Sequence, residues 1–437
     1  MVGKSGAARH STQVTVAATA PPSNQEASPA MSFHHALSLL RRRKASSAII
    51  ILEIAISCAI LCNAAYIIGL RLERASIPSG VAEREVVRIQ PVDLKEMENP
   101  DQITRADIAA LRAIPGVRSA SLTSFVPFGQ ADDAVPLRRT PDQQAPTLQA
   151  TAFIGDTGIA ETLGLRLIAG RLFDESDTVD WPQHQETKPS PGVALLTRSV
   201  AEQMFPEGDA VGRIFYIWSS DPVRVVGVVE HLKRGYVEGN PALYENSVLL
   251  PIRTSYSRIF GNYVLRADPG LRTEILDSAA RALMSINGNR AFFSIDTFED
   301  IRDEYFRKDL AMAWLLTSIC SALLAMTAFG IVGIVSFWVQ QRFREIGILR
   351  SLGAARTDIM KMFLLESFLL TTIGIAVGML LAYAINIRLM DYYEIARMPI
   401  HILPLGATIL WLLGVTAALY PATRAAMIPP ATATRLA

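Results

Sequence analysis

The stretch ASSAIIILEIAISCAILCNAAYIIGL, residues 45–70, decides the fold class of this chain. It contains one charged side chain, Glu53, and its apolar residues surround the whole circumference of a helix. A soluble amphipathic helix shows an apolar stripe instead, and roughly 20 apolar residues suffice to cross a bilayer. Because a helix satisfies its own backbone hydrogen bonds in lipid, residues 45–70 are predicted to span a membrane.

Three further stretches have the same character: residues 310–339, 363–387 and 402–420. The positive mean hydropathy and the 50% share of hydrophobic residues fit a chain that is partly embedded in a membrane. The net charge of +1 gives no indication of nucleic acid binding. All three cysteines lie in the apolar stretches, so the sequence predicts no disulfide framework.

Basic residues orient these spans. They precede the first span at residues 41–44, fill the connection 342–361 and follow the fourth span at Arg424 and Arg435. By the positive-inside rule, all three places are cytoplasmic, and so are both termini. The short connection 388–401 carries balanced charge and fits outside. The long region between the first two spans is therefore predicted to be extracytoplasmic.

The N-terminal region divides into two parts. Residues 1–30 are rich in Ala, Ser, Thr and Pro, and they are interpreted as a disordered extension because they contain too few apolar residues to form a core. Residues 31–71 are predicted to hold an interfacial amphipathic helix and the first span. We hypothesise that Met31 is the true start, and mass spectrometry showing a mature N-terminus upstream of it would refute this.

The segment between the first two spans, residues 72–308, is predicted to be an α+β domain. A strand–helix–strand pattern begins it and a second one ends it. The predicted strands are 85–90, 117–126, 262–266 and 291–295, and the predicted helices are 104–114 and 271–286. Two such halves are typical of a split ferredoxin-like unit, and the stretch between them then forms an inserted subdomain.

The insert has its own predicted elements. Strands are predicted at residues 193–196 and 223–229, where β-branched and other apolar residues follow one another. A Pro-rich, charged loop at residues 174–191 interrupts the insert before these strands and is predicted to be flexible.

The sequence gives no pattern typical of an enzyme. The soluble segment contains His184 and His231, but it lacks a nucleophile elbow, a metal-ligand pair and a Gly-rich phosphate loop. The doublet Asp132 and Asp133 falls in a predicted loop, where solvation is the favoured interpretation. We therefore predict no enzymatic activity, no metal site and no cofactor bound by this chain.

The insert and the C-terminal third carry motifs of a known family. The motifs are LG at 163–164, AGRLF at 169–173 with Asp177, MFP at 204–206, VG at 211–212, VVGVV at 225–229, RFREIGILRSLGA at 342–354 and PATRAA at 421–426. With these motifs the chain resembles permeases of the MacB/FtsX type from residue 31 to the end. The resemblance implies a MacB-like core domain at 72–308 and an FtsX-like permease domain at 309–437. The chain departs at Met427 and Pro429, where the family often has charged residues.

The resemblance implies a role for the cytoplasmic connection, which in this family couples the permease to an ATP-hydrolysing subunit. The candidate coupling residues are Arg342, Arg344, Glu345, Gly347, Arg350, Gly353, Ala354 and Arg356. The charges of Arg344, Glu345 and Arg350 would dock a partner, and Gly353 with Ala354 would allow the turn between helix ends. The sequence contains no complete Walker motif, so ATP would be used by a separate ABC ATPase. The alternative is that these charges only determine topology.

Small residues in the third and fourth predicted spans predict close helix packing, and they are Gly374, Gly378, Gly414 and Ala418. Packing inside one protomer is the favoured interpretation, while the resemblance supports an interface in a homodimer or heterodimer of permeases. The intramembrane carboxylates Glu53 and Glu366 are costly without partners, so pairing with arginines at the cytoplasmic end is predicted. A proton pathway is the alternative.

Two functions from different classes fit these features. The favoured one is the permease subunit of an ABC-type transporter in the bacterial inner membrane, which converts ATP hydrolysis by its partner into extracytoplasmic motion that exports or extracts a substrate. A periplasmic adaptor, an outer-membrane channel and membrane lipid are the further partners that the resemblance implies. The alternative is a transmembrane signalling or scaffold protein that activates an extracytoplasmic partner such as a cell-wall hydrolase.

Overall fold

The computed structural model describes residues 44–429 except 97, 183, 238–239 and 394–397. The predicted extension 1–30, the predicted interfacial helix, part of the connection 388–401 and the end of the C-terminal tail lie outside the described residues. The chain divides into two compact units. One is Ile67–Thr317, and the other combines Met1–Tyr66 with Ser318–Ala437.

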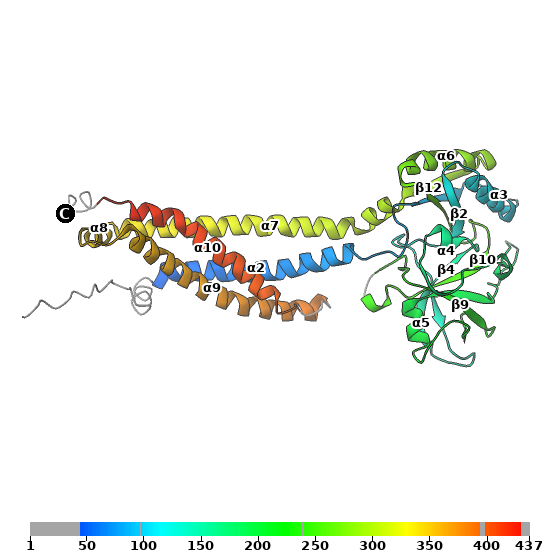
Figure 1. The fold of residues 1–437 in the computed structure, drawn as a ribbon, viewed down its shortest axis with the longest axis horizontal. Coiled ribbons are helices and arrows are strands. Elements are labelled where there is room, and N and C mark those ends of the chain that lie inside the picture. Colours follow the sequence, from blue (N-terminus) through cyan, green and yellow to red (C-terminus); the bar gives the residue numbers. More distant parts are fainter. Residues whose placement is uncertain (1–43, 97, 183, 238–239, 394–397, 430–437) are drawn as a thin grey trace, which may run out of the picture. The chain divides into compact units, whose positions relative to one another are not determined.

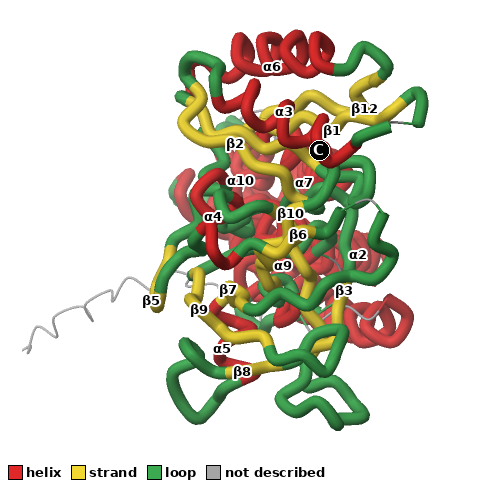
Figure 2. Tube along the Cα trace, turned by 90° about the vertical axis from the view of Figure 1, so that its right-hand side faces the viewer, coloured by secondary structure: helices red, strands yellow, loops and turns green. Residues whose placement is uncertain are grey.

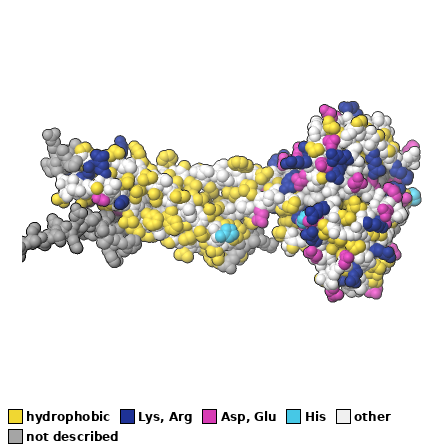
Figure 3. All heavy atoms as spheres, viewed as in Figure 1, with side chains coloured by type: hydrophobic (Ala, Val, Ile, Leu, Met, Phe, Trp, Pro, Cys, Tyr) yellow, Lys and Arg dark blue, Asp and Glu magenta, His cyan; other side chains and the backbone are white. Residues whose placement is uncertain are grey.

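Four helices among the described residues are long and apolar enough to cross a membrane, which confirms the four predicted spans. They are α2 (Lys44–Ala75), α7 (Phe298–Gln341), α9 (Arg356–Tyr393) and α10 (Ile402–Ala426), and the short helix α8 (Phe343–Ser351) connects α7 to α9 (Figure 1). Figure 3 shows hydrophobic side chains over most of the visible helical surface and many charged side chains on the unit Ile67–Thr317. The helix α7 begins earlier than the predicted span because its first turns are charged, and hydropathy detects only the apolar part.

The small residues of α9 and α10 lie against neighbouring helices of the same chain. A Cβ atom on Gly378 would come within 2.5 Å of the Cβ of Cys58 on α2, and one on Gly374 within 2.7 Å of the Ile54 side chain. A Cβ atom on Gly414 of α10 would lie 2.6 Å from the hydroxyl oxygen of Thr371 on α9, and Ala418 is buried. The structure thus supports the interpretation that these residues pack helices inside one protomer.

Polar side chains add bonds between these helices. The hydroxyls of Ser57 on α2 and Thr327 on α7 lie 2.9 Å apart, and the amide of Asn63 donates to the carbonyl oxygen of Ala382 at 3.1 Å. Such bonds replace water for groups that the apolar surroundings would otherwise leave unpaired.

In the unit Ile67–Thr317, the two halves predicted from the sequence assemble into one ferredoxin-like unit. Its elements are β1 (Val86–Asp93), α3 (Pro100–Arg112), β2 (Val117–Thr123), β11 (Asn262–Ala267), α6 (Arg272–Ile286) and β12 (Arg290–Thr297). The strands pair antiparallel in the order β12-β1-β11-β2. Figure 2 shows α3 and α6 together on one side of these strands, where a shared apolar core forms. The helix α3 ends before Gly116, which adopts a φ of 91° that favours glycine.

A buried ion pair fastens α3 to the sheet. Asp107 on α3 accepts hydrogen bonds from Arg290 at 2.7 and 3.2 Å and from the Tyr263 hydroxyl at 2.7 Å. Burial, together with the neighbouring Asp107 carboxylate, raises the pKa of Tyr263 well above its ordinary value. Each partner satisfies the others, which is what permits these charges in the core.

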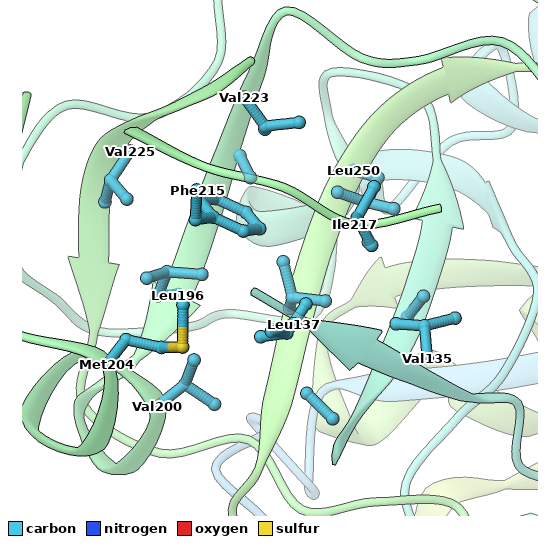
Figure 4. Close-up of a cluster of buried hydrophobic side chains, with 14 of the residues drawn as sticks. Val135, Leu137, Leu196, Val200, Met204, Phe215, Ile217, Val223, Val225 and Leu250 are labelled. Carbon is cyan, nitrogen blue, oxygen red and sulfur yellow. The ribbon is translucent and has the colours of Figure 1, made fainter. Parts of the chain in front are cut away.

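The insert extends the same sheet in the order β4-β10-β7-β9-β5 beyond β2. Its elements are β3 (Ala134–Leu137), β4 (Leu148–Gly155), α4 (Ile159–Thr162), β5 (Leu167–Gly170), η1 (Glu175–Asp177), β6 (Val179–Asp180), β7 (Val193–Thr197), α5 (Arg198–Met204), β8 (Ile214–Phe215), β9 (Val223–Val229), η2 (Pro241–Leu243) and β10 (Ser247–Arg253), and η3 (Pro269–Leu271) precedes α6. Figure 4 shows the apolar core of the insert, in which Leu196, Met204 and Phe215 meet.

The loop 174–191 corrects one expectation. It was predicted to be a flexible loop, but it contains η1 and β6, and β6 pairs with β10. Trp181 within it is buried, and its indole donates to the carbonyl oxygen of Gln185 at 3.0 Å. Proline and charge indicated a loop, whereas one large aromatic side chain anchors it in the core.

Candidate coupling site

The candidate coupling residues form a capped helix. The helix α8 ends in a Schellman motif: Gly353 has a φ of 100°, its amide donates to the carbonyl oxygen of Arg350 at 3.2 Å, and the Ala354 amide donates to that of Leu349 at 3.1 Å. The carboxylate of Asp358 then accepts from the Ala355 amide at 3.1 Å at the start of α9. The glycine therefore ends α8, and α9 starts directly after it.

Arg342 lies just before α8 and is buried. Its guanidinium donates two hydrogen bonds to the Glu366 carboxylate on α9, at 2.9 and 3.2 Å, and lies 6.0 Å from the centre of the Phe363 ring. Both side chains of the pair are almost fully buried. Glu366 thus has the arginine partner predicted for it, and the pair joins the start of α8 to α9.

Arg350 near the end of α8 holds the helix to a third element. Its guanidinium donates to the carbonyl oxygens of Ala426 at 3.0 Å and Ile428 at 2.8 Å, at the C-terminal end of α10. The Ala426 carbonyl belongs to the last turn of α10, where carbonyls have no partner within the helix, and the negative end of the helix dipole favours a cation there. Of the candidate coupling residues, Arg342 and Arg350 therefore have their guanidinium groups engaged within the chain, although Arg350 was expected to dock a partner.

The outer face of α8 carries a different set of side chains, which we term the α8 surface: Arg344, Glu345, Ile348, Leu349 and Leu352. Ile348 is 56% exposed, Leu349 is 40% exposed and Leu352 is 80% exposed. Arg344 and Glu345 are also exposed, whereas Ile346 and Gly347 face inward and are buried. Arg356, at the start of α9, is exposed as well.

Sequence reasoning selected charges and glycines and missed the apolar members of this surface. The run IGIL at 346–349 resembled the apolar spans on either side of it. The sequence signal that could have identified these exposed apolar residues is helical spacing, because it places Ile346 and Leu352 on different faces of a helix.

Glu53 has a different environment from Glu366. A Cβ atom built on Gly330 of α7 would lie 2.6 Å from a Glu53 carboxylate oxygen, so the carboxylate packs against the bare backbone of Gly330. Within the part of the chain that the structure describes, which does not include Arg41, Arg42 and Arg43, Glu53 forms no ion pair with an arginine, and the predicted pairing stays a prediction. The absence of a side chain at Gly330 is what leaves room for the carboxylate.

The candidate residues of the large unit are engaged in structural bonds. Asp132 forms an ion pair with Arg234 at 2.5 Å and is largely buried, whereas Asp133 pairs with Lys188 at 3.0 Å and its side chain remains 45% exposed, so only Asp133 fits the expected solvation. His231 lies 3.0 Å from the Glu245 carboxylate. No cluster of three or more potential metal ligands occurs among the described residues.

The fold and this site define a class: a four-helix membrane protein with a large α+β domain inserted after the first span. Two family models match it. The MacB-like periplasmic core domain matches residues 47–283, more than half of the chain, and the FtsX-like permease C-terminal domain matches residues 316–430. The chain belongs to the MacB/FtsX-type family of ABC transporter permeases, and it is an inner-membrane protein with a periplasmic domain.

Relatives share about a quarter of their residues with it. The macrolide export ATP-binding/permease protein MacB of Chromobacterium violaceum is 27% identical over 275 residues, which cover 61% of this chain and 40% of the relative. The protein of the same name from Bartonella quintana is 26% identical over 363 residues, covering 78% and 50%. The chain thus spans half or less of the length of these relatives.

Among solved structures, the periplasmic region of MacB from Actinobacillus actinomycetemcomitans is 17% identical. The match covers 52% of this chain and 94% of that one, with a TM-score of 0.34.

Proposed function

We propose that this chain is a mechanotransmitting permease subunit: an ABC ATPase docks on the α8 surface, and its ATP-driven motion is passed to the periplasmic domain, which exports or extracts a substrate. One observation carries the proposal. The helix α8 exposes three large apolar side chains next to Arg344 and Glu345, at a place where membrane proteins otherwise present polar loops. Exposed apolar patches of this kind mark protein interaction sites.

The bonds behind α8 support transmission of force. Arg342 joins its first turn to α9 through Glu366, and Arg350 joins its last turn to the end of α10. A load on α8 would therefore reach two spans through charge-assisted hydrogen bonds, which are stronger than neutral ones.

The helix α7 is the proposed carrier of motion to the periplasm. It is one helix of 44 residues that begins with Phe298, a core residue of the large unit, and ends at Gln341 next to Arg342. A continuous helix transmits displacement along its axis better than a hinged one, since no loop absorbs the movement.

The remaining parts of the proposal follow from this arrangement and from the family. The basic residues at 342–361 and Arg424 support a cytoplasmic α8 and cytoplasmic termini. The chain itself would be non-catalytic and bind no cofactor, and the ATPase would use the ATP. Met326 and Phe329 of α7 are highly exposed and apolar, so they would face lipid or a second permease in a homodimer or heterodimer. A periplasmic adaptor and an outer-membrane channel would complete an export system.

Affinity purification of the tagged full chain from mild-detergent membranes, followed by mass spectrometry, tests the proposal. We expect an ABC ATPase in the eluate. An adaptor or outer-membrane channel with it would support export, whereas a cell-wall hydrolase would favour the signalling function. Recovery of the chain without any ATPase would refute the proposed role.

A further inference from the structure

Arg302, in the second turn of α7, contacts the segment 75–83 through three groups. Its guanidinium donates to the carbonyl oxygens of Ala75 at 2.6 Å and Ile77 at 2.8 Å, and it forms an ion pair with Glu83 at 2.6 Å. Ala75 is the last residue of α2, whose final carbonyls have no partner inside the helix. A residue of α7 therefore caps the C-terminus of α2.

The same guanidinium lies over two aromatic rings. Its central carbon is 5.4 Å from the centre of the Phe128 ring and 5.6 Å from that of Phe306. Phe128 comes from the loop between β2 and β3 and is almost fully buried, and its ring centre lies 5.1 Å from that of Phe306. Arg302 thus joins the end of α2 to the loop that leads from the ferredoxin-like unit into the insert.

The backbone of this loop is held in an uncommon conformation. Phe128 has a φ of 63° and Gln130 a φ of 60°, a region that residues other than glycine rarely adopt. The Gln130 amide donates to the carbonyl oxygen of Gly235 at 3.1 Å, and a Cβ on Gly235 would lie 1.7 Å from the Ala131 carbonyl oxygen. Such a conformation persists where the surroundings determine it strongly, as at positions of function.

Three further bonds hold the first turns of α7 and the end of α2 in place. The hydroxyl of Tyr305 accepts a hydrogen bond from the Val237 amide at 2.8 Å, and Arg74 near the end of α2 donates to the Val237 carbonyl oxygen at 2.6 Å. One turn further along α7, Asp309 forms an ion pair with Arg71 of α2 at 2.6 Å. The first turns of α7 are therefore bonded to α2, to the Phe128 loop and to the segment around Val237.

We infer that Arg302 is a positioning residue that fastens the start of α7 to the end of α2 and to the Phe128 loop, so that motion of either helix displaces the ferredoxin-like unit and the insert together. This inference rests on the proposed function, in which α7 carries motion to the periplasm. We term this set of Arg302 contacts the joint. It requires one side chain with several hydrogen-bond donors, and a guanidinium offers five N–H donors in a planar arrangement, whereas a lysine offers a single compact ammonium group.

Hydrogen exchange of the full chain in detergent tests the joint itself. In R302K we expect the amides of Ile77, Phe128 and Val237, which lie in three separate segments, to exchange at least about tenfold faster. The amides of β9, in the core of the insert, should not change. The matched control is R272K, because Arg272 pairs with Glu299 in the first turn of α7 at 2.9 Å and contacts neither of the joined segments through that bond. Unchanged exchange in R302K, or equal changes in R272K, would overturn the inference.

Coupled activity with the ATPase partner provides the second measurement. We expect R302K to retain its basal ATPase stimulation within about twofold but to lose at least about tenfold in transport, while R272K retains both. Should R302K fail to fold, Y305F removes the hydroxyl that accepts a hydrogen bond from the Val237 amide, and the same exchange and transport losses are expected in weaker form. If wild type and R302K transport equally well, the inference is wrong. If even wild type shows no ATPase coupling, the proposed function fails, and the exchange result still decides whether the joint exists.

Discussion

The buried pair between Arg342 and Glu366 offers a quantitative test of how α8 is held. Replacing Arg342 with Met leaves the Glu366 carboxylate almost fully buried without its partner. Breaking a buried pair by removing one member costs about 3–5 kcal/mol, because an uncompensated charge remains. Replacing both members with apolar residues of similar size removes that penalty and is expected to cost no more than about 1 kcal/mol.

The assay is equilibrium unfolding of the purified full chain in mixed micelles with increasing dodecyl sulfate. R342M and E366L should each lower the free energy of unfolding by about 3–5 kcal/mol, and the double variant R342M/E366L should recover most of the loss. The matched control, R344M, changes an exposed arginine of the same helix and should shift it by less than about 0.5 kcal/mol. A double variant as unstable as the single ones, or single variants as stable as R344M, would refute the pairing argument.

Three other predictions follow from local geometry. Replacing Gly353 with Val should lower the free energy of unfolding by about 1–2 kcal/mol, because a valine is strained at the left-handed φ of 100°. The rate of hydrogen exchange of the amides at 353–354 should then rise by about tenfold or more. Replacing Gly378 with Val should separate α9 from α2 and reduce the yield of folded protein in size-exclusion chromatography, whereas G333A, at a glycine with open space around it, should be tolerated. The hydrogen bonds from the Arg171 guanidinium hold the pKa of Asp177 below its ordinary value of 3.8, against the opposing effect of burial. The ion pair therefore contributes about 0.5 kcal/mol to the free energy of unfolding above pH 3.8. This contribution is lost as the pH falls through the lowered pKa of Asp177. Thermal unfolding of wild type and D177N between pH 3 and 6 should therefore converge at the acidic end, and a constant difference would contradict the assignment.

The features that could be predicted from the sequence are those with a local signal. Four apolar runs and the basic residues between them identify the spans, because a bilayer imposes length and composition directly on each helix. The strand–helix–strand halves at 85–126 and 262–295 predict the split ferredoxin-like unit, because the hydrophobic period changes between two and 3.6 within each half. The observed order β12-β1-β11-β2 confirms it.

The features that the sequence did not reveal depend on side chains that meet over long sequence distances. Nothing in the run 342–354 indicates that Arg350 donates to the carbonyl oxygen of Ile428, and nothing around Glu53 indicates that it packs on Gly330. Trp181 lies in a stretch whose proline and charge content is typical of a loop, and only its burial shows that the loop is anchored. The apolar side of α8 was missed for a related reason, since the run IGIL at 346–349 has the same residue types as the spans on either side of it.

The central claim is that an ABC ATPase docks on the α8 surface, and one comparison tests it most directly. Tagged wild type, L352E and T357E would be purified from mild-detergent membranes, with the bound ATPase quantified by mass spectrometry. Leu352, directly after the last residue of α8, is the most exposed apolar residue of the α8 surface, and Thr357 is an exposed polar residue of α9 that lies outside this surface. We expect wild type and T357E to retain the ATPase and L352E to lose at least about tenfold, as a charge in a buried interface core does. Equal recovery of the ATPase with L352E and wild type would contradict the claim.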